Sequence, residues 1–291
     1  MSKFGYTPIS PNKYVIIVYM IKKVGLFEKK NRVLLYELVK TDFKLRYQGS
    51  FLGVLWSVLK PLMLFAVMYT VFVKFLKFTD GTTTYPIVLL LGISLWGFFT
   101  EATNIGMNSI VARGDLMRKI NFPKYIVILS SMASALISLS INLIVVILFA
   151  IITGVEFTPN VLLVPLSIIQ LFLLAFGVAL ILSTMYVKFR DISHIWEVVL
   201  QILMYAIPII YPITMVSNSH LLIAKIMMLN PIAQAIQDIR HNLIAPETTV
   251  TTWDLVNNFW VSIIPILLTF VIMAIGSWYF SRNSKIFAEI L

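Results

Sequence analysis

Long runs of apolar residues, each about long enough to cross a bilayer, dominate the chain after residue 50. A helix rises about 1.5 Å per residue, so roughly 30 Å of hydrocarbon requires about 20 residues. The runs are solidly apolar rather than alternating, and backbone amides in lipid must be bonded internally, which favours helices over barrel strands. The pattern predicts six membrane-spanning helices, at residues 51–73, 86–110, 125–152, 161–187, 192–211 and 259–280.

The composition excludes a typical water-soluble enzyme. Hydrophobic residues make up 59% of the 291 positions and charged residues 12%, whereas ordinary soluble domains are about half apolar and a quarter charged. We therefore expect an all-α integral membrane fold. Cysteine is absent and the three histidines lie far apart in sequence, so disulfides and thiol chemistry are excluded and no metal site is expected.

The basic residues indicate how the chain is oriented. Of the 23 lysines and arginines, 18 flank one side of the predicted spans, 4 flank the other side and one lies within a span. Because cytoplasmic loops carry the excess of positive charge, both termini and the loops after the second and fourth spans are predicted to be cytoplasmic. The net charge of +10 thus reflects topology, and no nucleic-acid partner is expected because the basic residues form no surface interleaved with aromatics.

The N-terminal segment, residues 1–50, is expected to be cytoplasmic and to contain an amphipathic helix at 31–48. The apolar residues expected on one side are Val33, Leu34, Leu38 and Val39, with Tyr36 and Leu45 nearby, and the basic residues expected to stay in water are Arg32, Lys40, Lys44 and Arg46. A basic helix of this kind lies in the headgroup plane of anionic lipid. It is either a plain interfacial anchor or an element that also contacts a cytoplasmic partner or a lipid substrate.

Prolines interrupt the chain between the fifth and sixth spans. Pro208 and Pro212 each remove a backbone donor and break or kink the helix there. Two short apolar pieces follow, and Asn230 with Pro231 suits a capped helix start. Neither piece is long enough to cross the membrane, so both are expected to be short re-entrant helices on the outer side, next to a transport path.

Two charges fall inside predicted spans. Lys60 and Glu101 have similar expected depths on the cytoplasmic side, and charges in hydrocarbon mark functional sites by default. The two side chains either pair, extend separately to the headgroups, or leave Lys60 facing the pathway, where it meets an anionic headgroup.

Aromatic residues recur at helical spacing in the first two spans. Phe65, Tyr69 and Phe72 form one row and Trp96 and Phe99 another. Aromatic faces stack on sugar rings, so these rows either line a glycan path or pack between helices and in the interfacial belt.

The cytoplasmic loop 112–125 is unusually mixed in charge. Gly114 and Asp115 can start a short helix, Leu116 and Met117 offer an apolar knob, and Pro123 restarts the chain into the next span. An apolar knob rimmed by charge favours docking of a soluble partner, and the alternative is a solvated turn kept basic by topology.

No motif for nucleotide hydrolysis or other catalysis is present. The sequence contains no G-x-x-x-x-G-K-[ST] loop, no H-E-x-x-H and no G-x-S-x-G. The outer-loop acids form no tight cluster, which argues against a membrane glycosyltransferase or ligase, and Glu101 alone is too little for ion-driven transport. Active transport would then draw its energy from a separate ATPase.

The ordered motifs resemble the membrane permease subunit of ABC-2 type polysaccharide exporters, the group that exports O-antigen, teichoic acid, capsule and rhamnan. The resemblance covers residues 37–280. The matching segments are KLRYQGSFLGVLWSVLKPL, GDLMRKINFP, VKFRDISHI and YPITM followed by LNPIAQAIQDIR.

The resemblance implies a division of labour. Residues 51–291 would form the ABC-2 transmembrane domain, paired with a second copy of the chain and with two ATPase subunits that bind ATP and Mg²⁺, so that this chain has no catalytic residues and no cofactor of its own. The cytoplasmic loop would be the coupling helix that docks on the ATPase. The implied coupling residues are Arg113, Gly114, Asp115, Leu116, Met117, Arg118, Asn121 and Pro123.

The resemblance also implies a substrate, a glycan on an undecaprenyl-pyrophosphate type lipid in the bacterial inner membrane. Arg46, beside Tyr47, would meet the pyrophosphate through guanidinium contacts. An exporter of small drugs or lipids is the alternative. The expected path residues are Arg46, Tyr47, Lys60, Phe65, Tyr69, Phe72, Trp96, Phe99 and Glu101, and the expected outer-gate residues are Pro208, Pro212, Asn230 and Pro231.

Overall fold

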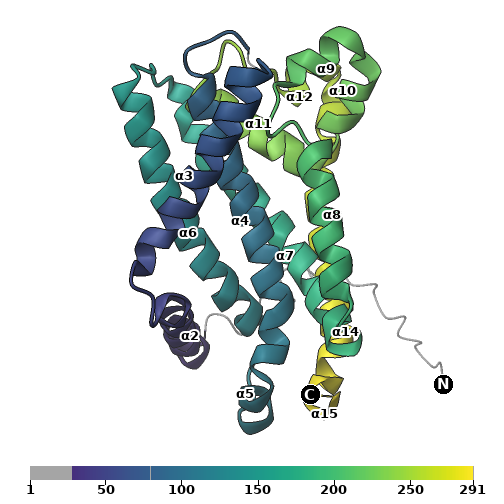
Figure 1. The fold of residues 1–291 in the computed structure, drawn as a ribbon. Coiled ribbons are helices and arrows are strands. Elements are labelled where there is room, and N and C mark those ends of the chain that lie inside the picture. Colours follow the sequence, from purple (N-terminus) through teal and green to yellow (C-terminus); the bar gives the residue numbers. More distant parts are fainter. Residues whose placement is uncertain (1–27, 79, 291) are drawn as a thin grey trace, which may run out of the picture.

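The computed structural model describes residues 28–78 and 80–290, which form helices and connecting turns with no strand in that part of the chain (Figure 1). The first 27 residues of the predicted N-terminal segment lie outside the described residues. The fold is a bundle of long helices with α2 (Lys29–Tyr47) and α5 (Gly114–Lys119) at one end and short helices at the other (Figure 1). We call these the α5 end and the α9 end.

Five helical segments among the described residues are long and apolar enough to cross a membrane. They correspond to five of the six predicted spans, which confirms the all-α membrane fold. The first consists of a 3₁₀ turn, α3 (Trp56–Met68) and a π-helical turn. The five segments are Gly53–Phe75, Tyr85–Ala112 (α4), Tyr125–Ile152 (α6), Pro159–Lys188 (η3 and α7, Val164–Lys188) and Phe259–Asn283 (α13 and α14, Ile264–Asn283).

The predicted fifth span is shorter than expected. Helix α8 (Ile192–Ala206) has 15 residues, which corresponds to about 22 Å at the usual helical rise. It ends where Pro208 interrupts the backbone hydrogen bonding, and the chain stays irregular until α9 begins at Ile213. Residues 28–78 and 80–290 therefore contain five helical segments of full spanning length and a shorter sixth helix, α8, that contacts α4 and α7.

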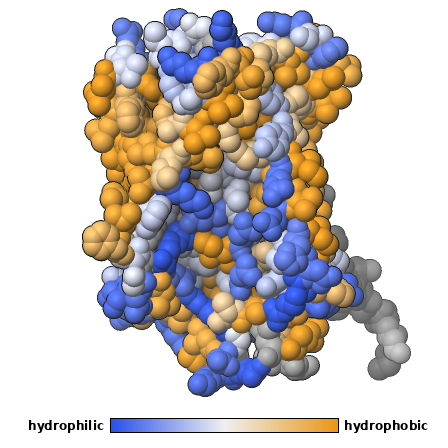
Figure 2. Space-filling view, viewed as in Figure 1, coloured by the Kyte–Doolittle hydropathy of each residue, from blue (hydrophilic) through white to orange (hydrophobic). Residues whose placement is uncertain are grey.

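Helix α4 is the centre of the packing. It lies between α6 and α7, and 78% of its most apolar window is buried, compared with none for the Gly53–Phe75 segment. A helix that is apolar on all sides is buried by its neighbours. The orange flanks in Figure 2 show that much of the outer surface of the bundle is equally apolar, as expected for a surface covered by lipid.

Glycine allows α7 and α14 to cross closely. Gly177 on α7 and Gly276 on α14 face each other, and a Cβ at Gly177 would lie 2.8 Å from the Cα of Met273. Small residues at such crossings let helix backbones approach and gain packing energy where lipid supplies no hydrophobic driving force.

The α9 end is built from short helices. These are α9 (Ile213–Ser219), α10 (Leu221–Met228), α11 (Pro231–Leu243) and α12 (Thr252–Val256). Asn230 caps α11, since its side chain accepts a hydrogen bond from the Ile232 amide at 2.9 Å, and Pro231 occupies the first turn. The predicted helix break and the predicted capped start are both confirmed. Helix α11 packs into the bundle against α7 and α4.

Replacing Gly276 by alanine is expected to destabilise the bundle, because the new methyl group would overlap the Gly177 carbonyl across the helix crossing. Overpacking of this kind costs roughly 1–3 kcal/mol. The apparent melting temperature of the detergent-purified protein measures the loss. Gly97→Ala is the matched control, since nothing lies within 4 Å of a Cβ there. Equal melting temperatures for the two variants would contradict this account of the crossing.

Candidate functional site

Helix α2 lies across the α5 end and packs on α6 (Figure 1). Leu34, Leu35 and Leu38 pack against the core, while Tyr36 and Leu45 stay exposed. The helix is thus amphipathic as predicted, but Val33, expected on its apolar side, is exposed. Arg46, expected to stay in water, instead turns into the bundle, and together with Asp42 it brings charged groups there.

Arg46 leaves α2 and enters the space between α4 and α6. Its Nη1 forms an ion pair with Glu101 of α4. The same guanidinium donates to the Ser138 hydroxyl at 2.9 Å and to the Ser134 hydroxyl at 3.0 Å, both on α6. The exposed fractions are only 17% for the Arg46 side chain and 34% for that of Glu101, so the pair neutralises two charges in largely apolar surroundings.

A second ion pair joins α2 to the end of α4. Asp42, one helical turn before Arg46, pairs with Arg113, the residue that ends α4 and precedes α5. Ser130 of α6 completes the group, because it receives a hydrogen bond from Arg113 Nη1 at 3.2 Å and donates one to Asp42 at 3.3 Å. Arg113 is therefore tied to both α2 and α6.

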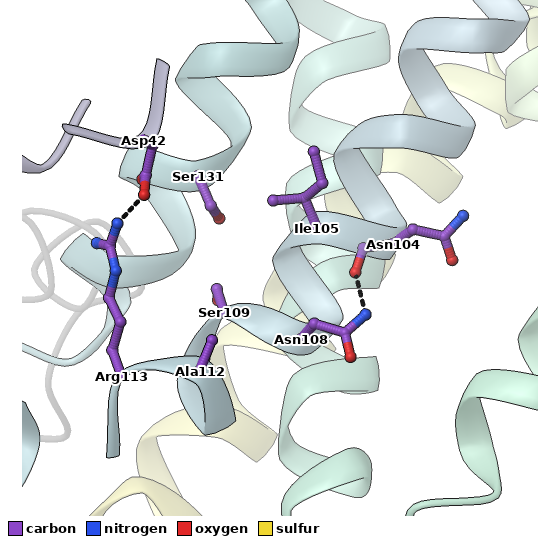
Figure 3. A pocket seen from close by; sticks show the side chains of 8 residues that line it. All are labelled: Asp42, Asn104, Ile105, Asn108, Ser109, Ala112, Arg113 and Ser131. Atoms are coloured by element: carbon purple, nitrogen blue, oxygen red, sulfur yellow. Dashed lines mark hydrogen bonds and ion pairs between the residues drawn. The ribbon is translucent and has the colours of Figure 1, made fainter. Parts of the chain in front are cut away.

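A cavity of about 290 Å³ opens beside this second pair. In Figure 3, Asp42, Arg113 and Ser131 lie on one side of it and Asn104 and Asn108 on the other. Figure 2 shows a hydrophilic hollow in the same half of the molecule, between apolar flanks. We call this cavity the polar hollow; its lining residues are Asp42, Asn104, Ile105, Asn108, Ser109, Ala112, Arg113 and Ser131.

Sequence reasoning missed most of the polar hollow. Glu101 does not pair with Lys60, the partner considered from depth alone; it pairs with Arg46, and the exposed Lys60 forms no ion pair within the described residues. One signal was available, because Ser130, Ser134 and Ser138 recur every four residues in an otherwise apolar span and so form a polar stripe on one helix face.

The two predicted aromatic rows differ in burial in the structure. Trp96 and Phe99 are buried in the core, with 6% and 1% of their surface exposed, and therefore serve as packing residues. Phe65 on α3 and Tyr69 at the start of the following π-helical turn stack at a centroid distance of 5.7 Å, and Phe72 packs partly against the core. The side chain of Tyr47 lies outside the described residues.

The predicted coupling loop forms α5 at the tip of the bundle (Figure 1). The expected apolar knob is only partly present, because Met117 is buried in the core and Leu116 packs against it. Asp115, Arg118 and Asn121 are exposed instead. A cavity of about 330 Å³ adjoins α5, lined by Met117, Arg118, Lys119, Ile120, Asn121, Phe122 and Lys124.

Arg240 fixes the predicted outer-gate segment at the α9 end. Its buried guanidinium donates to the backbone carbonyls of Pro208 and Ile209, both at 2.7 Å, and to that of Val88 at 3.1 Å. It thereby satisfies carbonyl groups that the break after α8 leaves without helical partners. Because Gly92 has no side chain, there is space for the Arg240 guanidinium; a Cβ at Gly92 would overlap it. Pro212 lies directly before α9 as its N-cap.

A buried amide and carboxyl cluster adjoins Arg240 on α11. Gln170 of α7 donates to Gln234 at 2.6 Å, and Gln234 donates to Asp238. The second carboxyl oxygen of Asp238 is buried without a partner in the described structure. Burial raises the pKa of Asp238 to about 7; the Gln234 hydrogen bond acts against this rise, and the nearby Asp254 adds to it.

These features define a class: a multi-pass helical membrane protein with a polar, ion-paired mouth at one end and broken helices at the other. Comparison with known families identifies the protein family within this class. Residues 33–244 match the family described as ABC-2 type transporter, and the chain belongs to that family.

Three relatives are similar over most of the chain. One O-antigen export system permease protein RfbA of Klebsiella pneumoniae is 25% identical over 259 residues, which cover 89% of this chain and 95% of the relative. A second from Klebsiella pneumoniae is 28% identical over 206 residues, 70% and 77% of the two chains. The RfbA of Myxococcus xanthus is 27% identical over 190 residues, 64% and 71% of the two chains.

Reversing one charge of the Arg46–Glu101 pair is expected to destabilise the protein. Glu101→Arg would place two positive groups together, and losing one partner of an ion pair with this degree of burial costs roughly 1–4 kcal/mol. The double variant Arg46→Glu/Glu101→Arg restores opposite charges and is expected to recover at least part of the loss in melting temperature. Lys60→Gln is the control and should have little effect. A double variant as unstable as the sum of its single variants would contradict the pairing.

The Asp238 carboxyl is expected to make stability depend on pH. Its ordinary pKa is 3.8 and the folded value is about 7, so between about pH 4 and 7 the folded chain retains a proton that the unfolded chain releases. Stability from this group therefore falls as pH rises through that window. Asp238→Asn removes this slope, and its melting temperature relative to wild type should be higher at about pH 8 than at about pH 4. A constant difference would contradict the shifted pKa.

Proposed function

We propose that the chain is the membrane permease of an ABC exporter that moves lipid-linked polysaccharide across the bacterial inner membrane, driven by a separate ATPase. The observation that carries the proposal is the similarity to three O-antigen export permeases, one of which is matched over 95% of its length. Family membership supports the transport role.

The ATPase would dock at the α5 end. Asp115, Arg118 and Lys119 project from α5 and are exposed, and the adjoining cavity of about 330 Å³ offers room for a partner's side chain. This end holds α2 and the basic loop, and by the excess of positive charge it would face the cytoplasm. ATP and Mg²⁺ would bind to the partner.

A second copy of the chain would complete the pathway. The Gly53–Phe75 segment has no buried residue in its apolar window, and α8 exposes Ile195, Ile202 and Tyr205. In Figure 1 these two elements flank the face that shows the hydrophilic hollow of Figure 2. Two such faces brought together would enclose a polar path, with lipid covering the remaining apolar surface.

The substrate's pyrophosphate would enter at Arg46. The guanidinium already holds one carboxylate, Glu101, and a phosphate group can compete for the same donors because arginine binds both anions through two parallel N–H groups. The Arg46–Glu101 pair would then open when the lipid headgroup arrives and close after it leaves.

The coupling role of α5 predicts that Asp115→Lys separates ATP hydrolysis from export. In proteoliposomes containing the permease and its ATPase, ATP-dependent transfer of a polyprenyl-pyrophosphate glycan is expected to fall about tenfold or more, a barrier change of about 1.4 kcal/mol or more, while ATP hydrolysis continues. Glu247→Lys is the matched control, because it reverses an exposed acid at the opposite end and should export normally.

Two outcomes would count against the proposal. Unchanged export by Asp115→Lys would remove the coupling role of α5. Stimulation of the wild-type complex by small drugs, with no response to the glycolipid, would favour a small-molecule exporter.

A further inference from the structure

We infer that the polar hollow binds an uncharged, hydroxyl-rich group, namely the first sugar of the lipid-linked glycan, beside the pyrophosphate at Arg46. This inference rests on the proposed function and specifies how one part of the substrate is recognised. Its basis is the charge balance, the unpaired hydrogen-bonding groups, the size and the location of the hollow.

The charges around the hollow cancel. Asp42 and Arg113 neutralise each other, and the neighbouring Arg46 and Glu101 do the same. The two charged residues that line the hollow, Asp42 and Arg113, are held by each other and by Ser130, so the lining itself has no net charge. It suits a neutral ligand that both donates and accepts hydrogen bonds.

Unpaired polar groups follow one face of α4. The Asn104 side chain has no hydrogen-bond partner among the described residues, and the Asn108 side chain uses one N–H, donated to the Asn104 backbone carbonyl at 2.8 Å. One turn deeper, the Thr100 hydroxyl is buried without a partner. Residues 100, 104 and 108 are four apart and therefore lie on one helix face. Asn104 is half-buried and Asn108 is exposed, so their remaining amide groups are open to hydrogen bonds with sugar hydroxyls.

The floor of the hollow suits the remaining surface of a sugar. Ile105 and Ala112 lie between the polar sides, and the C–H face of a pyranose ring can pack on such apolar groups. The volume of about 290 Å³ lies at the lower end of the range for small-molecule pockets, roughly 300–1,000 Å³, and so fits a single sugar rather than a polymer.

The hollow lies close to Arg46, as it must if it is to hold a sugar bonded to a pyrophosphate at that residue. Asp42 lines the hollow, and Arg46 lies four residues further along α2, a separation of about 5–6 Å between Cβ atoms. A pyrophosphate at Arg46 would therefore place the sugar bonded to it at the edge of the hollow.

The test measures binding of two probes to the permease–ATPase complex in nanodiscs. One probe is polyprenyl pyrophosphate carrying a single N-acetylhexosamine, and the other is the same lipid without sugar. The wild-type complex is expected to bind the sugar-bearing lipid about fivefold tighter or more, because a site built for hydroxyl groups loses affinity when they are absent. Asn104→Leu/Asn108→Leu should abolish this preference and leave binding of the sugar-free lipid unchanged.

Asn218→Leu, an exposed site on α9, is the matched control and should retain the preference; Asn104→Ala/Asn108→Ala replaces the leucine variant if the latter does not fold. Equal binding of both probes to wild type overturns the sugar site, as does a loss in the variant that affects both probes equally. If the glycolipid is still exported in those cases, the proposed function stands and only this inference fails. If neither probe binds and no glycolipid is exported, both fail.

Discussion

Charge inside an apolar bundle has to be paired, and this constraint determines how the α5 end is built. Arg46 on α2 and Glu101 on α4 are 55 residues apart in sequence, yet each is the charged partner of the other. Leaving either one alone in low-dielectric surroundings would cost several kcal/mol. The pair therefore fixes the position of α2 on the bundle, and the Asp42–Arg113 pair, of opposite polarity along α2, fixes it a second time. A slip of α2 by one turn would place like charges together.

The same requirement appears at the α9 end in another form. Arg240 has no carboxylate partner among the described residues; it donates to backbone carbonyls that the broken chain after α8 leaves exposed. One buried cation thus replaces missing helical hydrogen bonds at the place where prolines prevent a continuous span. The two ends differ in consequence: ion pairs at the α5 end can exchange partners with an incoming anion, whereas the carbonyl cluster around Arg240 has no anion to exchange.

The sequence predicted those structural features that depend on one residue type with one local effect on the backbone. Apolar runs predicted the long helices, Pro208 predicted the end of α8, and Asn230 with Pro231 predicted the start of α11. Partner choice was less predictable, because it depends on how helices cross. Depth alone made Lys60 one possible partner of Glu101, but Arg46 reaches it from α2. Likewise, spacing could not show that Met117 turns inward from α5, and Asn104 and Asn108 gave no motif.

At the α5 end, residues next to the proposed ATPase-docking helix are linked to the residues proposed to bind the substrate headgroup. Arg113 ends α4, precedes α5 and holds Asp42, so a displacement of α5 by a docked partner acts on the last turns of α2. Those turns carry Arg46, whose guanidinium holds Glu101 at the mouth of the bundle. Ion pairs of this kind have discrete partners, so a small movement exchanges one arrangement for another rather than stretching it. Under the proposed function, mechanical input at α5 and headgroup binding at Arg46 would therefore act on the same short stretch of α2, and this physical connection would let an ATPase without contact to the substrate influence when the mouth opens.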